Sequence, residues 1–107
     1  MEVLVVQTGS EALVRLIGKL VAGDTDGVYQ EVRKLIPVSK KIVLDLTDLA
    51  YMDSMGLGTI IRLYVSAKSA GCDLELINLS KRIRELLGLT NLLSVFSMCG
   101  EHTIRMP

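Results

Sequence analysis

Two patterns of hydrophobic and polar positions follow one another along this chain. Short runs of β-branched and aliphatic residues predict strands, whereas apolar residues that recur at every third or fourth position predict helices. The runs place strands at residues 3–6, 12–20, 42–44 and 73–78, with a short turn and an edge strand within 92–96. The helices are expected at about 24–36, 54–70 and 80–88.

The borders of these elements carry recognisable signals. Residues 23–26 indicate a helix start, where an Asp or Thr can cap exposed N–H groups, and Pro37 ends that helix. Gly71 predicts a left-handed end of the second helix. Gly18 interrupts its strand, which is typical of a bulge or of a close approach by another backbone. After residues 42–44, the acidic residues of 45–48 predict that the strand gives way to a loop.

The order of elements predicts an α/β fold. Strands that alternate with helices require right-handed crossovers and parallel central strands, and the two N-terminal strands form a hairpin that adds an antiparallel strand. We therefore expect a single-layer mixed sheet of about four to five strands, with parallel central strands, flanked by three to four helices. Residues 1–107 are expected to form one domain.

Charge and composition exclude several classes of function. Twelve basic and twelve acidic residues give a formal net charge of zero, so there is no electrostatic argument for nucleic acid or an anionic membrane as a partner. Neutrality also leaves little repulsion between copies of the chain. Glu2 stands where a signal peptide would be basic, and no stretch is long and uncharged enough to span a bilayer. We expect a cytoplasmic protein.

The sequence predicts no metal site and no cofactor. Cys72 and Cys99 lack metal-ligand spacing and are expected to be reduced, structural thiols. His102, which is the single histidine, is expected to be a surface residue.

One cluster of residues at a strand-to-helix connection stands out as a candidate site. Loops after the carboxyl ends of central strands are where α/β sheets usually bind their ligands. Each glycine inside a helix costs about 1 kcal/mol relative to alanine, so two glycines within one turn indicate a close approach of another backbone or a phosphate. The cluster consists of Asp53, Ser54, Met55, Gly56, Leu57 and Gly58.

The residues of this cluster leave three interpretations open. Ser54 can be the N-cap of the helix, with Asp53 complementing the helix dipole. Alternatively, Ser54 is a modification site, because a helix N-terminus favours a bound phosphate. A catalytic serine is the third interpretation, but the nucleophile-elbow pattern G-x-S-x-G is absent and the only histidine lies in the tail, so no enzyme is expected.

The residues from 42 to 64, IVLDLTDLAYMDSMGLGTIIRLY, resemble the STAS domain of the anti-sigma factor antagonist family. A second similar segment is GCDLELINLSKRIRELLG at 71–88, and residues 15–20 and 24–35 are more loosely similar. The Asp-Ser-x-Gly-Leu-Gly run is specific, and the resemblance covers about residues 3 to 97. It implies a STAS-like fold.

The resemblance also implies a function. Members of the family bind a serine-kinase anti-sigma factor and thereby release a sigma factor. The kinase uses ATP and Mg²⁺ to phosphorylate the serine that follows the aspartate, and a phosphatase restores the unmodified form. By position, Ser54 would be phosphorylated, and Asp53 to Gly58 would bind the partner. The alternative is a STAS scaffold, or a soluble subunit of a stress-signalling complex or membrane transport system.

Two features depart from the family pattern. Met55 occupies a place where many relatives carry a second small hydroxyl residue, so the local surface is more apolar. Relatives usually end in a further helix, whereas only about ten residues follow Phe96. A missing terminal helix would expose apolar surface and favour a homodimer.

Overall fold

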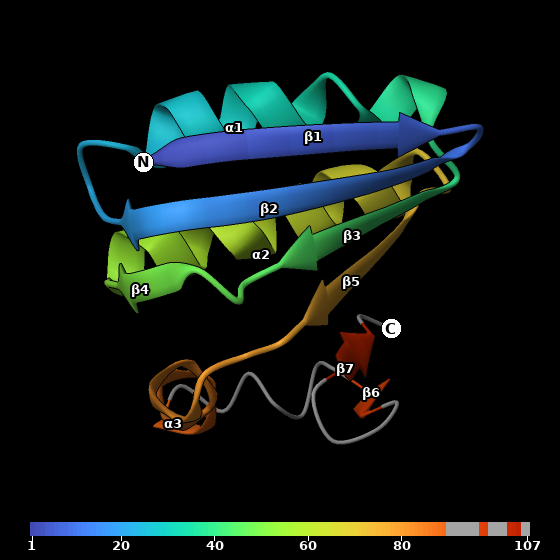
Figure 1. Cartoon of the computed structure of the whole chain (residues 1–107). Coiled ribbons are helices and arrows are strands. Elements are labelled where there is room, and N and C mark those ends of the chain that lie inside the picture. Colours follow the sequence, from blue (N-terminus) through green and yellow to red (C-terminus); the bar gives the residue numbers. More distant parts are fainter. Residues whose placement is uncertain (90–96, 99–102, 106–107) are drawn as a thin grey trace.

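The computed structural model describes residues 1–89, 97–98 and 103–105 (Figure 1). The edge strand expected within 92–96, as well as Cys99 and His102, lie outside the described residues. The strands are β1 (Glu2–Thr8), β2 (Glu11–Leu20), β3 (Lys41–Asp45), β4 (Leu49–Met52), β5 (Asp73–Ile77), β6 (Ser97–Met98) and β7 (Thr103–Arg105). The helices are α1 (Thr25–Arg33), α2 (Ser54–Ser69) and α3 (Lys81–Leu89), with one 3₁₀ turn at Ile36–Val38.

The strands form one mixed sheet in the order β1-β2-β3-β5-β7-β6. β2, β3 and β5 are parallel to one another, while β1 pairs antiparallel with β2 and β7 pairs antiparallel with β5. This arrangement confirms the expected mixed sheet with parallel central strands and the expected N-terminal hairpin. The short strands β4, β6 and β7 bring the number of strands above the four to five that the sequence predicted.

β4 stands where the sequence predicted a loop after β3, so that prediction is wrong. β4 runs parallel to the last part of β2, and the register shifts between Gly18 and Lys19. The Gly18 N–H donates to the carbonyl oxygen of Asp48 at 3.1 Å, and the φ of +112° at Gly18 suits glycine. The bulge and the backbone approach predicted from Gly18 are therefore confirmed. The strand was missed because its buried residues are the first and the last of four, so no alternation is visible.

The main core lies between the sheet and the pair of helices α1 and α2, which lie on the same face (Figure 1). Alternate residues of the strands point into it, and fully burying each aliphatic side chain contributes about 1.5–3 kcal/mol. The buried side chains include Val14, Leu16, Ile42, Leu44 and Leu76 from the strands and Val32, Ile60 and Leu63 from the helices.

The two helices begin and end close to their predicted borders. α1 has Asp24 at its N-cap position but without a side-chain cap, and it ends at Arg33, a few residues before Pro37 enters the 3₁₀ turn. α2 stops before Gly71, whose φ of +74° confirms the predicted left-handed end. The pair is also joined by polar contacts, since the Tyr29 hydroxyl lies 3.0 Å from Ser66 Oγ.

Candidate functional site

The start of α2 is held in place by Asp53, which caps the helix. Its backbone is extended, one carboxylate oxygen accepts the Gly56 N–H at 2.9 Å, and the other accepts the Ala22 N–H at 3.2 Å. The Asp53 N–H in turn donates to the carbonyl oxygen of Leu20. One side chain therefore satisfies a free donor of the helix and ties α2 to the chain that follows β2.

Ser54 is the first residue of α2 and is exposed. Because Asp53 is the N-cap, the interpretation of Ser54 as the N-cap is wrong. No hydrogen bond to the Ser54 hydroxyl occurs within the described part of the chain. The hydroxyl therefore faces solvent at the positive end of a 16-residue helix, where a phosphate group is electrostatically favoured.

The other four residues of the cluster divide between surface and interior. Met55 is 57% exposed, and Gly58 is half-buried, with no heavy atom within 4 Å of the place that a Cβ atom would occupy. Gly56 and Leu57 are buried. Ser54 and Met55 are therefore the members of the cluster that are most accessible to a partner, whereas Gly56 and Leu57 face the interior.

Gly56 is needed for a contact within the protein. A Cβ atom at this position would overlap the carbonyl oxygen of Leu20 and would lie 2.8 Å from Cγ of Met52. The close backbone approach inferred from the two glycines is therefore confirmed at Gly56, where α2 packs directly against the end of β2. Gly58 has no such contact among the described residues.

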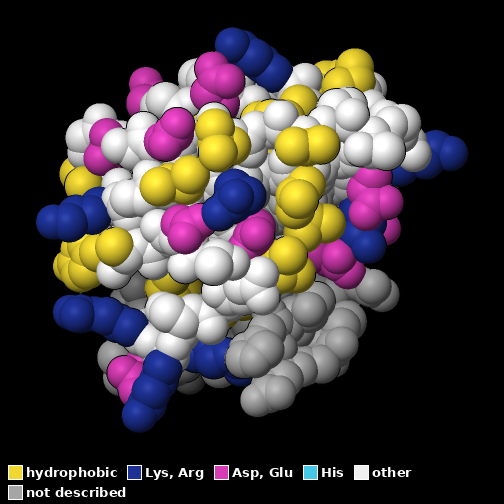
Figure 2. Space-filling model, in the orientation of Figure 1, with side chains coloured by type: hydrophobic (Ala, Val, Ile, Leu, Met, Phe, Trp, Pro, Cys, Tyr) yellow, Lys and Arg dark blue, Asp and Glu magenta, His cyan; other side chains and the backbone are white. Residues whose placement is uncertain are grey.

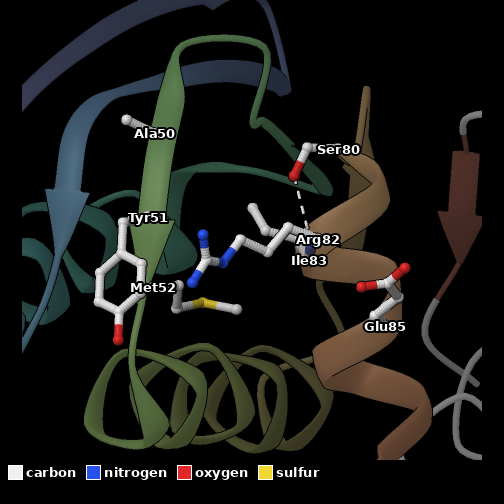
Figure 3. Close-up of a pocket in the computed structure, with 7 residues that line it drawn as sticks. All are labelled: Ala50, Tyr51, Met52, Ser80, Arg82, Ile83 and Glu85. Carbon is white, nitrogen blue, oxygen red and sulfur yellow. Dashed lines mark hydrogen bonds between the residues drawn. The ribbon is translucent and has the colours of Figure 1, made fainter.

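A pocket of about 230 Å³ lies beside this site, between β4 and α3 (Figure 3). Figure 3 shows the Arg82 side chain extending across the pocket toward Tyr51, and the guanidinium carbon lies 5.4 Å from the ring centroid. Met52 both lines the pocket and contacts Gly56, so the pocket adjoins the start of α2. The lining residues are Ala50, Tyr51, Met52, Ser80, Arg82, Ile83 and Glu85.

The pocket could not be predicted from the sequence, because its walls come from β4, which has no readable periodicity, and from α3, which is distant in the chain. The sequence did predict a helix that opens at Ser80, and the Ser80 hydroxyl accepts the Ile83 N–H at 3.2 Å. The sequence features that could have indicated this pocket are Tyr51, an aromatic residue shortly before the cluster, and the run of basic residues in α3.

Asp45, the last residue of β3, links the carboxyl ends of β3 and β5. Burial alone would raise the pKa of Asp45, but hydrogen bonds from Thr47 and from the Asn78 amide stabilise the carboxylate, so its pKa lies below the ordinary value. Asn78 adopts a φ of +58°, which aspartate and asparagine tolerate better than most residues. Asp45 therefore fixes the end of β3 against the end of β5.

Two other groups in the described part of the chain have shifted pKa values. The hydrogen bond with Ser66, together with Arg33 and Arg62, lowers the pKa of Tyr29 despite the opposing effect of desolvation. Burial, together with the nearby Asp73, raises the pKa of the Cys72 thiol. A thiol with a raised pKa is a poor nucleophile, and Cys72 is buried, as expected for a structural thiol.

The described residues contain no group of three or more His, Cys, Asp or Glu side chains that could hold a metal ion. Likewise, no helix in the described ranges is long and apolar enough to cross a membrane.

Comparison with known proteins identifies the family. The family model for the STAS domain matches residues 2–105, so the chain belongs to the STAS domain family. It is 32% identical over 86 residues to a protein of Bacillus subtilis (strain 168) named anti-sigma-B factor antagonist, covering 76% of this chain and 79% of that protein.

Solved structures have the same fold. An anti-sigma factor antagonist from Mycobacterium paratuberculosis superposes with a TM-score of 0.76 at 17% identity, covering 87% of this chain and 80% of that chain. The Bacillus protein SpoIIAA matches with a TM-score of 0.70 and 19% identity in both its unphosphorylated and its phosphorylated form. The coverage is 82% of this chain and 83% of SpoIIAA in the first form, and 85% of each chain in the second.

Proposed function

We propose that this protein is an anti-sigma factor antagonist that binds a serine-kinase anti-sigma factor and thereby frees a sigma factor. In this proposal Ser54 is the phosphorylation site that controls binding. The supporting observation is the exposed Ser54 hydroxyl at the first position of α2, held there by the Asp53 cap. The name of the B. subtilis relative, and the phosphorylated form in which SpoIIAA has been solved, support the same function.

The geometry suits a switch that works by charge. A phosphoserine adds nearly two negative charges beside the Asp53 carboxylate, on the surface where Met55 is exposed. The helix N-terminus stabilises the phosphate in the free protein. In a docked complex the same phosphate would be desolvated or placed near like charges, which would weaken binding by about two to three decades.

The switch needs no change of fold in this proposal. Asp53 retains its hydrogen bonds to Gly56 and Ala22 whether or not Ser54 is modified, because those bonds do not use the Ser54 hydroxyl. This chain supplies the acceptor hydroxyl, while the partner kinase supplies ATP, Mg²⁺ and the catalytic groups. It therefore acts as a binding protein rather than an enzyme, in the cytoplasm, and a phosphatase returns it to the binding form.

The experiment is phosphorylation with purified cognate kinase. We expect incubation with the serine-kinase anti-sigma factor, ATP and Mg²⁺ to place one phosphate on Ser54, located by mass spectrometry. Ser54→Ala should accept no phosphate and bind the kinase constitutively. Ser69→Ala is the matched control, because Ser69 is an exposed serine at the other end of α2. A phosphate on Ser54→Ala, or none on the wild type, would contradict the proposal.

A further inference from the structure

The edge strand β1 is a second surface of interest, remote in sequence from the start of α2. Its seven residues pair with β2 in unbroken register, from Glu2 opposite Ile17 to Thr8 opposite Glu11. Among the strands of the described residues, none pairs with the other side of β1. In an antiparallel pair alternate residues point their N–H and C=O groups away from the partner strand, so β1 presents a row of such groups outward.

β1 lacks the features that usually protect an edge strand. Natural edge strands carry charged residues, especially lysine, or proline and bulges. In β1 the only charged residue is Glu2 at its first position, and there is neither a proline nor a bulge. Its side chains remain accessible, since Leu4 is 42%, Val5 40% and Val6 59% exposed.

The apolar surface of β1 continues onto its neighbours. Val6 lies opposite Leu13, and Leu13 lies beside Val43, so these three side chains form one row across β1, β2 and β3. Because Ala12 and Val14, on either side of Leu13, are buried in the core with α1 and α2, this row lies on the face of the sheet away from those two helices. Figure 2 shows hydrophobic side chains on this face on both sides of a cluster of charged side chains.

We propose that two copies of this chain associate through β1, as an antiparallel pair of strands about a two-fold axis at Val5. Val5 is the midpoint of the seven residues, so this register pairs all of them. It places Val5 opposite its own copy, Leu4 opposite the second copy's Val6, and Val3 opposite Gln7. Glu2 meets Thr8, so no like charges face each other.

A second copy is the occupant that fits this edge. The strand is self-complementary in the antiparallel direction, and the chain has no net charge to oppose association. Pairing satisfies the outward backbone groups of both strands and joins the two sheets into one. Because the same surface is used on both copies, assembly closes at a dimer and does not propagate.

Sedimentation equilibrium of the whole chain tests the proposal. We expect the protein to change from mostly monomer to mostly dimer as its concentration rises from the low micromolar to the submillimolar range. Val5→Lys should weaken the dimer about tenfold or more, because two ammonium groups would face each other at the axis. Val65→Lys is the matched control, since Val65 is a comparably exposed valine on α2 and should leave the dimer unchanged. If Val5→Lys impairs folding, Val6→Lys serves in its place.

Cross-linking tests the register. Under mild oxidation Val5→Cys should form a disulfide-linked dimer, because directly opposed residues bring their Cα atoms within disulfide range. Val3→Cys should not cross-link to itself, and the wild type controls for the native thiols. A chain that stays monomeric, larger assemblies that grow with concentration, or a dimer unaffected by Val5→Lys would overturn the proposal. None of these results depends on Ser54 phosphorylation, so the two proposals fail separately.

Discussion

The start of α2 and the edge strand β1 are built in opposite ways. At the start of α2, the Asp53 carboxylate accepts the backbone N–H groups of Gly56 and Ala22, and Gly56 packs closely against Leu20. These contacts fix the backbone there, while the Ser54 side chain stays exposed. β1 is bonded on one side, and its side chains are largely exposed. Changes at Asp53 or Gly56 should therefore affect folding, a change at the exposed Ser54 should affect binding, and changes in β1 should affect association.

The largest effect is expected at Gly56, and Gly58 provides the contrast. Gly56→Val should destabilise the fold by about 3 kcal/mol or more, because the new side chain would overlap the Leu20 carbonyl and push α2 away from β2. Gly58→Ala should stabilise the fold by up to about 1 kcal/mol, since a methyl group there meets no heavy atom within 4 Å. Urea unfolding measures both. Equal effects at the two glycines would show that the helix start is not tightly packed.

Ser54→Asp separates binding from folding within the same helix turn. We expect it to weaken the complex with the purified kinase by about tenfold to a hundredfold, because one negative charge reproduces part of the effect of a phosphate. Its free energy of unfolding should match that of the wild type, as the exposed side chain has no partner in the described chain and an acidic residue suits a helix N-terminus. Calorimetric titration that gives an unchanged affinity would rule out the charge switch.

Asp53→Ala should cost about 1 kcal/mol of stability, as the loss of an N-cap typically does. Asp53→Asn is the matched variant, because asparagine is an equally good N-cap and should retain most of the stability. Urea unfolding of the two variants measures the difference. If alanine were as stable as asparagine, the hydrogen bonds of Asp53 to Gly56 and Ala22 would not hold the helix start.

The smallest effect on folding is expected in β1. Val6→Lys should change the free energy of unfolding of the monomer by no more than about 0.5 kcal/mol, since the side chain is 59% exposed. The measurement is urea unfolding at a protein concentration where the dimer is absent. A large loss of stability would show that Val6 is packed and that β1 is not an open edge.

The general fold followed from the pattern of residues. Alternating strand and helix signals predicted the mixed sheet with parallel central strands, and Gly18 indicated a bulge or a close backbone approach, both of which the structure has. The strand β4 could not be predicted, because a four-residue segment with only Leu49 and Met52 buried has no readable period, and its pairing with β2 depends on the bulge at Gly18.

The candidate site was located by sequence, but the roles of its residues were not. The spacing placed Asp53, Ser54 and the two glycines at a helix start. Asp53 rather than Ser54 caps the helix by accepting the Gly56 N–H, and its second carboxylate oxygen accepts the N–H of Ala22, which lies 31 residues away in the chain. Likewise, nothing in the motif distinguishes Gly56 from Gly58, and the difference arises because only Gly56 faces Leu20.

The class of fold, the position of the candidate site and the near absence of charge in β1 can be read from the chain alone, because periodicity and composition are properties of neighbouring residues. The exposure of Ser54, the close packing of Gly56 and the edge position of β1 among the described strands arise from folding. These properties depend on contacts between residues far apart in the chain, which exist only once the sheet and helices have packed together.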